Sequence, residues 1–161
     1  MSGAKVLNAS EGINVDALDV PLDPHGAGKK QNYLKVLYQV ANSLTKIFGL
    51  AEIQHAILRD AISQAFTSAG FAPNGKETWQ LPSPPFSNVW TILEQMEEEI
   101  GGNVRNLNLR VQPLFETGVI PENPDPKGFE IVLEETRVLR LSNLATPELM
   151  VAVSRFVLQK L

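Results

Sequence analysis

Four arginines are the residues whose type and spacing come nearest to a chemical function. Arg105 and Arg110 lie in one segment, and Arg137 and Arg140 follow in the last third of the chain. A guanidinium can donate two parallel hydrogen bonds to an anion, so these side chains could contact a phosphate, a neighbouring subunit's nucleotide or an acidic surface. Ordinary ion pairs with acidic residues such as Glu116 are the alternative, and we favour them on the sequence alone.

A short glycine-rich basic stretch, residues 25–30 (HGAGKK), is similar to part of a phosphate-binding loop. The full pattern is G-x-x-x-x-G-K-[ST], in which backbone amides surround the phosphates. Here Asp23 stands at the first glycine position and Lys30 at the Ser/Thr position. The pattern is therefore incomplete, and a flexible basic turn in front of a helix is the preferred interpretation.

The remaining titratable groups predict neither a metal site nor a catalytic group. His25 and His55 lack partners at metal-ligand spacing, and His55 has Glu52 and Arg59 as helical neighbours, which predicts a solvated face. The three consecutive glutamates 97–99 could supply carboxylates for a metal or for acid–base chemistry. Consecutive helical residues point in different directions, however, so a solvated face is again the better interpretation.

The bulk properties indicate a globular protein and exclude several classes. The chain has 161 residues, 43% of them hydrophobic, with a net charge of −4 and no cysteine. It can bury a core of ordinary size but cannot form disulfides or a cysteine-based zinc site. The acidic balance argues against a broad nucleic-acid surface while leaving room for a local basic patch. No apolar run is long enough for a membrane segment and no signal peptide is evident, so we expect a cytoplasmic location.

A region from residue 32 to 118 is predicted to be helical, after an extended or loop segment over residues 1–31. Apolar residues at helical spacing run from Tyr33 to Phe48 and stop at Gly49, a typical C-terminal cap. A second stripe from Ile53 to Phe66 follows almost at once, which predicts an antiparallel helical hairpin.

Two more helices are expected after a loop over residues 70–85. The first has apolar residues from Phe86 to Ile100 and ends at Gly101-Gly102. The second is capped by Asn103 and leaves Arg105, Asn106 and Arg110 available to solvent, while Pro113 is expected to weaken its last turn.

The last third, residues 128–161, is predicted to contain a short β pair and a terminal helix. The runs Phe129–Leu133 and Val138–Leu141 have strand composition. Thr146 and Pro147 suit a helix start, and the apolar pattern that follows covers most of the helix circumference and predicts burial. We therefore expect a single domain or subdomain over 1–161, mainly α with a small β component (α+β), and interpret the terminal helix, which lacks a stop signal, as part of something larger.

Four stretches, taken together, resemble HerA/FtsK-like ATPases, the group that includes DNA translocases and helicase-type motors. They cover most of the chain, and one departure is that Asp16-Ala17-Leu18 stands where the family often has Asn-Pro-Leu. The similar stretches are INVDALDVPLD (13–23), the helical pair from NYLKV to SQAF (32–66), NVRNLNLRVQPLFETGVI (103–120) and VLRLSNLATPELMVAVSRFVLQKL (138–161).

The resemblance implies that this chain is the segment between the Walker A loop and the Walker B strand of an α/β P-loop ATPase. Neither of those elements is in the sequence, so the chain alone should lack catalytic residues, metal ligands and cofactors, and should not turn over ATP. The parent protein would use ATP and Mg²⁺, assemble as a ring and act on DNA, which this segment would contact only indirectly. Arg105 and Arg110 are then candidates for contacting a neighbour's nucleotide in trans.

A different class of function is also compatible with the sequence. The chain could be a free-standing α-rich adaptor that binds a protein through the exposed face of its helical hairpin and performs no catalysis. A small hydrolase is disfavoured, because the sequence contains no nucleophile–base pair to support it.

Overall fold

The computed structural model describes residues 5–8, 17–116, 136–140, 147–148, 150–152 and 155. The chain forms two compact units. Leu18–Arg110 form the first, here called the helical unit, and Met1–Ala17 with Val111–Leu161 form the second, here called the strand unit.

Helix α1 (Tyr33–Phe48) confirms the first predicted helix. The side-chain oxygen of Asn32 accepts a hydrogen bond of 3.0 Å from the Leu34 amide and so caps the first turn. Gly49 ends the helix in the left-handed conformation, with φ 62° and ψ 44°, where a side chain would be strained. The buried face consists of Tyr33, Val36, Leu37, Val40, Ala41, Leu44 and Phe48.

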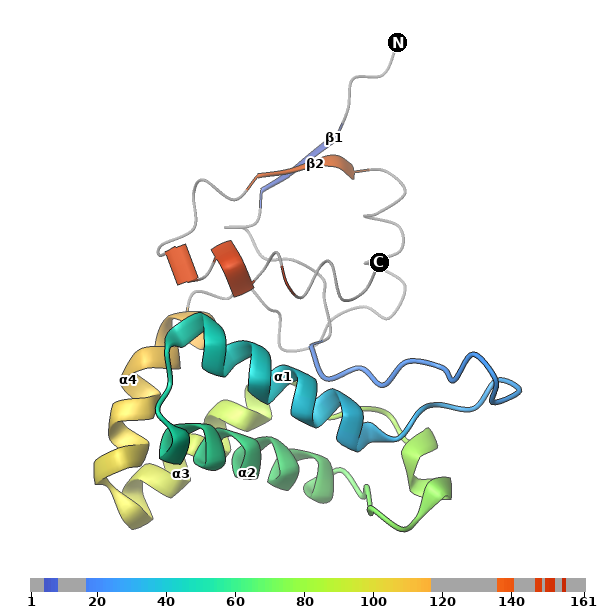
Figure 1. The fold of residues 1–161 in the computed structure, drawn as a ribbon, viewed down its shortest axis with the longest axis horizontal. Helices are drawn as coiled ribbons and strands as arrows, with labels where there is room; N and C mark the ends of the chain where they lie inside the picture. The colour runs from blue at the N-terminus through green and yellow to red at the C-terminus, as the bar shows by residue number, and fades with distance from the viewer. Residues whose placement is uncertain are drawn as a thin grey trace. The chain divides into compact units, whose positions relative to one another are not determined.

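Helix α2 (Glu52–Ser68) confirms the second predicted helix and packs beside α1 (Figure 1). At its start, the Gln54 side chain accepts a hydrogen bond of 2.9 Å from the Ala51 amide. Near the connection Thr45 of α1 contacts His55, whereas farther along Tyr38 of α1 contacts Arg59. The contacting residues thus run backward along α1 as they run forward along α2, so the two helices are antiparallel, as predicted.

Three aromatic rings join the open end of the hairpin. Tyr33 in the first turn of α1, Phe66 in the last turns of α2 and Phe71 just after it have ring centroids 5.0–5.2 Å apart. Their tilted and edge-to-face arrangements are favourable for the ring quadrupoles. Burial raises the pKa of the Tyr33 hydroxyl above its ordinary value, which is about 10. As pH rises, the Tyr33 hydroxyl therefore loses its proton at a lower pH in the unfolded chain than in the folded protein. The stability contributed by the buried neutral phenol is fully present below pH 10 and is lost as pH rises above about 10.

The connection after α2 contains a short helical turn that the sequence prediction treated as loop. This is η2, a 3₁₀ helix over Lys76–Gln80. Thr78 Oγ1 accepts a hydrogen bond of 2.9 Å from the Ala72 amide, and Trp79 Nε1 donates one of 3.0 Å to the Ala72 carbonyl. These bonds to a single upstream residue fold the segment back on itself, which a pattern of Pro and Gly could not reveal.

Helices α3 (Ser87–Ile100) and α4 (Gly102–Glu116) follow as expected, with one boundary corrected. Gly101 has φ 70° and ψ −145° and allows an abrupt change of direction between them. Asn103 was predicted as the cap of α4, but the helix already begins at Gly102, because two glycines permit the turn without a side-chain cap. Side chains that are fully buried from these helices in the helical unit are Val89, Leu93, Val104 and Leu107.

In the strand unit, β1 (Lys5–Asn8) pairs in parallel with β2 (Thr136–Arg140). The register matches Val6 with Val138 and Asn8 with Arg140. The predicted run Val138–Leu141 overlaps β2, whereas the other predicted run, Phe129–Leu133, lies outside the described residues. The described part of the chain is thus mainly helical, as predicted.

The terminal helix is represented by its described residues only. Pro147, Glu148, 150–152 and Arg155 are helical. Ala152 is buried, but Val151 exposes 48% of its side chain. Met150, one of the apolar residues on which the predicted burial rests, is half-buried, and the others (Leu149, Val153, Phe156, Val157 and Leu161) lie outside the described residues, so the burial of this helix stays a prediction. Among the helices that the structure describes, none combines the length and the apolar character needed to cross a bilayer.

Candidate functional site

Arg110, one of the two predicted nucleotide contacts, binds within its own unit. Its Nη1 donates a hydrogen bond of 3.1 Å to the carbonyl of Phe48, the last residue of α1. Carbonyls at a helix C-terminus have no partner within the helix and carry partial negative charge, so a guanidinium is well suited to them. This contact gives Arg110 a structural role: it ties α4 to the end of α1.

Arg105, the other predicted contact, is exposed on α4. At 100° per residue, its side chain leaves the helix about 140° away from that of Arg110. The two guanidinium groups therefore do not converge on one ligand from this helix. Arg137 and Arg140 lie in β2, and their side chains are outside the described residues.

The two histidines occupy different environments. His25 is exposed in the turn before α1, where its amide donates a hydrogen bond of 3.0 Å to Asp23 Oδ1. The ring of His55 is half-buried, and its Nδ1 lies 2.7 Å from Thr45 Oγ1. The predicted solvated position of His55 is therefore wrong, because the hairpin turns this side of α2 toward α1.

The basic stretch at residues 25–30 is part of a hydrogen-bonded loop. Leu22 and Lys30 form an antiparallel bridge, and the Asp23 amide donates to the Lys29 carbonyl at 2.8 Å. Lys30 in turn holds the segment after η2, since its amide donates to Gln80 Oε1 at 3.0 Å and its Nζ to the Leu81 carbonyl at 3.2 Å. These partners are those of a surface connection.

Of the three consecutive glutamates, only Glu97 is directed to a polar partner that the structure records. Its Oε2 accepts a hydrogen bond of 2.8 Å from Asn108 Nδ2, which also donates to the Leu93 carbonyl at 3.1 Å. Asn108 is 3% exposed, and its Oδ1 is buried without a partner among the described residues. Glu98 and Glu99 are exposed, as predicted. Within the described residues no three acidic, histidine or cysteine side chains come close enough to hold a metal ion.

The exposed side of the hairpin carries a group of side chains that the sequence analysis did not single out. We call it the α1 basic surface. It combines two lysines, three neutral hydrogen-bonding side chains and an arginine from α2 whose guanidinium carbon lies 5.9 Å from the centroid of the Tyr38 ring. Its members are Lys35, Tyr38, Gln39, Asn42 and Lys46 of α1 and Arg59 of α2.

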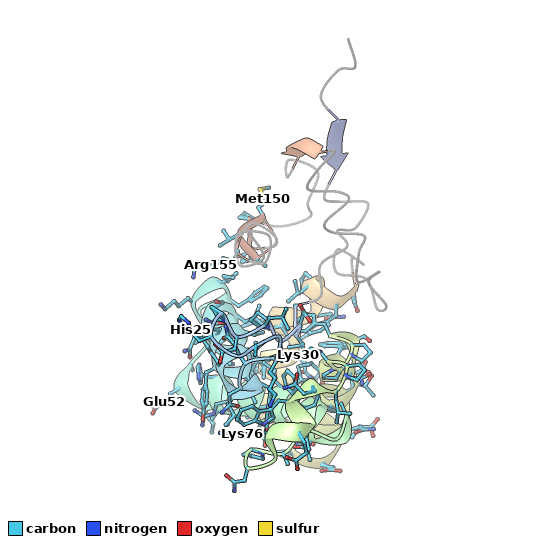
Figure 2. All side chains as sticks on the ribbon, turned by 90° about the vertical axis from the view of Figure 1, so that its right-hand side faces the viewer. His25, Lys30, Glu52, Lys76, Met150 and Arg155 are labelled. Atoms are coloured by element: carbon cyan, nitrogen blue, oxygen red, sulfur yellow. The ribbon has the colours of Figure 1, made fainter. Side chains whose placement is uncertain are left out.

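A signal for this surface was present in the sequence. No Asp or Glu occurs from Pro24 to Ala51, although the whole chain has a net charge of −4. Glu52, the acidic residue that follows this run at the start of α2, is labelled in Figure 2. The sequence does not show that Arg59 belongs to this surface, because only the packing of α2 against α1 brings it next to Tyr38.

Comparisons with protein families, with curated proteins and with solved structures found no significant match for this chain.

Proposed function

We propose that this chain is the helical portion of a HerA/FtsK-like, ATP-dependent DNA-processing motor. The observation that carries the proposal is the parallel pairing of β1 with β2, which lie on either side of the helical unit in the sequence. Parallel strands need a long crossover between them, and parallel sheets occur almost only in α/β proteins with helices on both faces. A P-loop ATPase is such a protein. The two strands and the helices of this chain would then belong to its larger sheet and to the helices that cover it, which would account for the α+β character.

In such a motor the helical unit would be a long insertion between two neighbouring strands. A pair of strands alone is marginally stable in water, so the β1–β2 pairing is better understood as part of a wider sheet. The unit would contribute packing between subunits of a ring, while ATP and Mg²⁺ would be bound by elements outside this sequence.

Arg105 is the better of the two arginines for a contact with a neighbour's nucleotide. It is exposed, whereas the guanidinium of Arg110 is engaged with the Phe48 carbonyl. Replacing Arg110 would loosen the join between α4 and α1 and so affect stability, whereas replacing Arg105 would remove a positive charge from the surface.

The test uses the full natural polypeptide that contains this sequence. We expect its reading frame to continue into a strand ending in acidic residues, and the purified protein to hydrolyse ATP with Mg²⁺. Arg105→Ala should lower turnover about 10³-fold or more if it acts in trans, at unchanged unfolding midpoint. Normal turnover by Arg105→Ala would remove the trans role, and the absence of ATP hydrolysis by the natural polypeptide would remove the motor assignment.

An α-rich adaptor is the second candidate, and one observation favours it. Tyr38 on α1 and Ile53 on α2 expose 48% and 52% of their side chains on the hairpin. Tyrosine is enriched among the residues that dominate binding at protein interfaces, and Ile53 adds exposed apolar surface on the same hairpin. An adaptor predicts a natural polypeptide without ATP turnover whose binding to a protein partner is lost in Tyr38→Ala and Ile53→Ala.

A further inference from the structure

The α1 basic surface lies opposite the face with which α1 packs into the helical unit. Its α1 members recur at intervals of three and four residues, so they form one continuous strip along the helix. Tyr38 exposes 48% of its side chain, and Lys35, Gln39, Asn42 and Lys46 are also exposed. The strip is therefore accessible along nearly the whole length of α1.

The charge of this strip is of one sign. Lys35 and Lys46 lie near its ends, and α1 contains no acidic residue. Helix α2 contributes Arg59 beside Tyr38, while its acidic residues are Glu52 in the first turn and Asp60, which accepts a hydrogen bond of 3.0 Å from Gln64 of the same helix. The middle of the strip thus presents positive charge next to neutral hydrogen-bonding groups.

Tyr38 and Arg59 form the centre of the strip. The Arg59 guanidinium carbon lies 5.9 Å from the Tyr38 ring centroid, within the range of a cation–π interaction. A cation–π contact restricts the guanidinium, and it engages the face of the cation while the N–H donors project from its edge, the direction from which an anion is bound. Less conformational entropy is then lost when the arginine binds a phosphate.

From these observations we propose that the α1 basic surface binds the sugar–phosphate backbone of a nucleic acid. Contacts to phosphate and sugar are made by Lys and Arg together with Asn, Gln and Tyr, which are the residue types of this strip. Lys35 and Lys46 are eleven residues apart on a straight helix, a rise of about 16 Å. Each strand of duplex DNA carries one charge per about 3.4 Å of the helix axis, so one strand offers several phosphates over this length and can meet all three cations.

A protein partner fits the strip less well. Lysine is depleted from protein interfaces, whereas two lysines lie in this strip and Tyr38 is its one large apolar side chain. The contacts would be to the backbone, so binding should be weak and nearly independent of base sequence. The inference goes beyond the proposed function, which requires only indirect contact with DNA, and it competes with the adaptor, whose protein interface would use the same Tyr38.

The experiment measures binding of the 161-residue chain to fluorescent 30-nucleotide DNA, single-stranded and duplex, by anisotropy at several salt concentrations. Three cations predict that log K falls with log salt with a slope of about −2.7 for duplex and about −2.1 for single strands. Lys35→Glu and Lys46→Glu should each weaken binding about tenfold at 50 mM salt and make the slope shallower by about 1. Lys35→Gln and Lys46→Gln serve as milder variants should either reversal disturb the helix.

The matched control is Lys76→Glu, which has the same charge change at an exposed lysine of η2 (Figure 2). Less than a twofold change in affinity is expected for this variant.

Binding by one form of DNA only would identify the preferred form and still support the surface. Equal weakening by Lys76→Glu would overturn the proposal in favour of a bulk charge effect, as would no binding of either DNA at 50 mM salt. If the chain binds no DNA but self-associates, and Lys46→Glu abolishes the self-association, the strip is a protein interface. That result would also overturn the proposal. No ATP measurement enters, so this result is separate from the motor assignment.

Discussion

Helices α1 and α3 belong to the same unit and bury similar apolar faces, yet they expose opposite charges. The exposed side of α1 carries Lys35 and Lys46, whereas that of α3 carries Glu94, Glu98 and Glu99. Packing in the core fixes which side of each helix faces inward and leaves the charge of the outer side free to vary. The outer sides are therefore where function can be selected without changing the fold.

The two helices also differ at their C-termini. Lys46 lies in the last turn of α1, where a positive charge interacts favourably with the helix dipole. The last turn of α3 has no basic residue and contains Glu98 and Glu99, which interact unfavourably with the same dipole. The acidic surface of α3 thus costs some stability, whereas the basic surface of α1 contributes to it.

The largest expected effect on stability comes from truncating a buried leucine, and comparing one in each helix would show whether the two helices are equally well packed. Leu44 of α1 and Leu93 of α3 are both fully buried. Replacing either with Ala should lower the free energy of unfolding by about 2 to 5 kcal/mol, measured by urea denaturation. Ile53→Ala, at a position 52% exposed, is the control and should change it by less than about 0.5 kcal/mol. A small loss at only one leucine would mean that its helix is loosely packed.

The glycines that end the two helices should differ in their tolerance of a side chain. Gly49, after α1, has φ 62° and ψ 44°, which an L-residue can adopt at a cost of about 1 kcal/mol. Gly101, after α3, has φ 70° and ψ −145°, a combination found essentially only in glycine. Gly101→Ala should therefore destabilise the protein by about 2 kcal/mol, more than Gly49→Ala does. Equal unfolding midpoints for the two variants would contradict this backbone difference.

A smaller effect is expected from the polar contact between α3 and α4. Asn108 Nδ2 donates to the Leu93 carbonyl and to Glu97 Oε2, although its own buried Oδ1 has no recorded partner. Asn108→Ala should cost about 1.5 kcal/mol, and Glu97→Gln, which keeps an oxygen at the contact, about 0.5 kcal/mol. A more stable Asn108→Ala variant would indicate that the unpaired oxygen outweighs both bonds.

The smallest effects test the charge difference directly. Glu98→Lys in α3 should raise the free energy of unfolding by about 0.3 to 1 kcal/mol, and Lys46→Glu in α1 should lower it by a similar amount. Both changes should shrink when thermal unfolding is followed at 1 M salt instead of 50 mM, because salt screens exposed charges. Shifts of Tm in the same direction for both variants would contradict the dipole argument.

Much of the helical unit could be predicted because its signals are local. The stripe ending at Gly49 defined α1, and the stripe ending at Gly101 defined α3, since periodic apolar residues and terminal glycines depend on neighbouring positions only. The start of α4 was displaced by two residues, because a cap at Asn103 would begin the helix at residue 104 whereas the two adjacent glycines let it begin at Gly102. The turn at η2 was missed because its bonds run back to Ala72, and no spacing rule encodes such a contact.

The candidate sites depended on contacts between distant residues and were harder to predict. Arg110 was chosen for its charge, but its actual partner is the Phe48 carbonyl in another helix. His55 was expected in solvent, but Thr45 across the hairpin contacts its ring. A side chain's availability depends on which groups the fold places within a few ångströms of it, and the sequence lists those groups without their positions.

By itself, the sequence determined the positions of α1, α2 and α3, the end of α1 at Gly49 and the acid-free run from Pro24 to Ala51. Each follows from residue type and short-range spacing. The tertiary structure alone decided that β1 pairs in parallel with β2, that Arg110 binds the end of α1 and that the Arg59 guanidinium lies over the Tyr38 ring. These are contacts between residues far apart in the chain, and they form only when burial of the apolar faces brings the elements together.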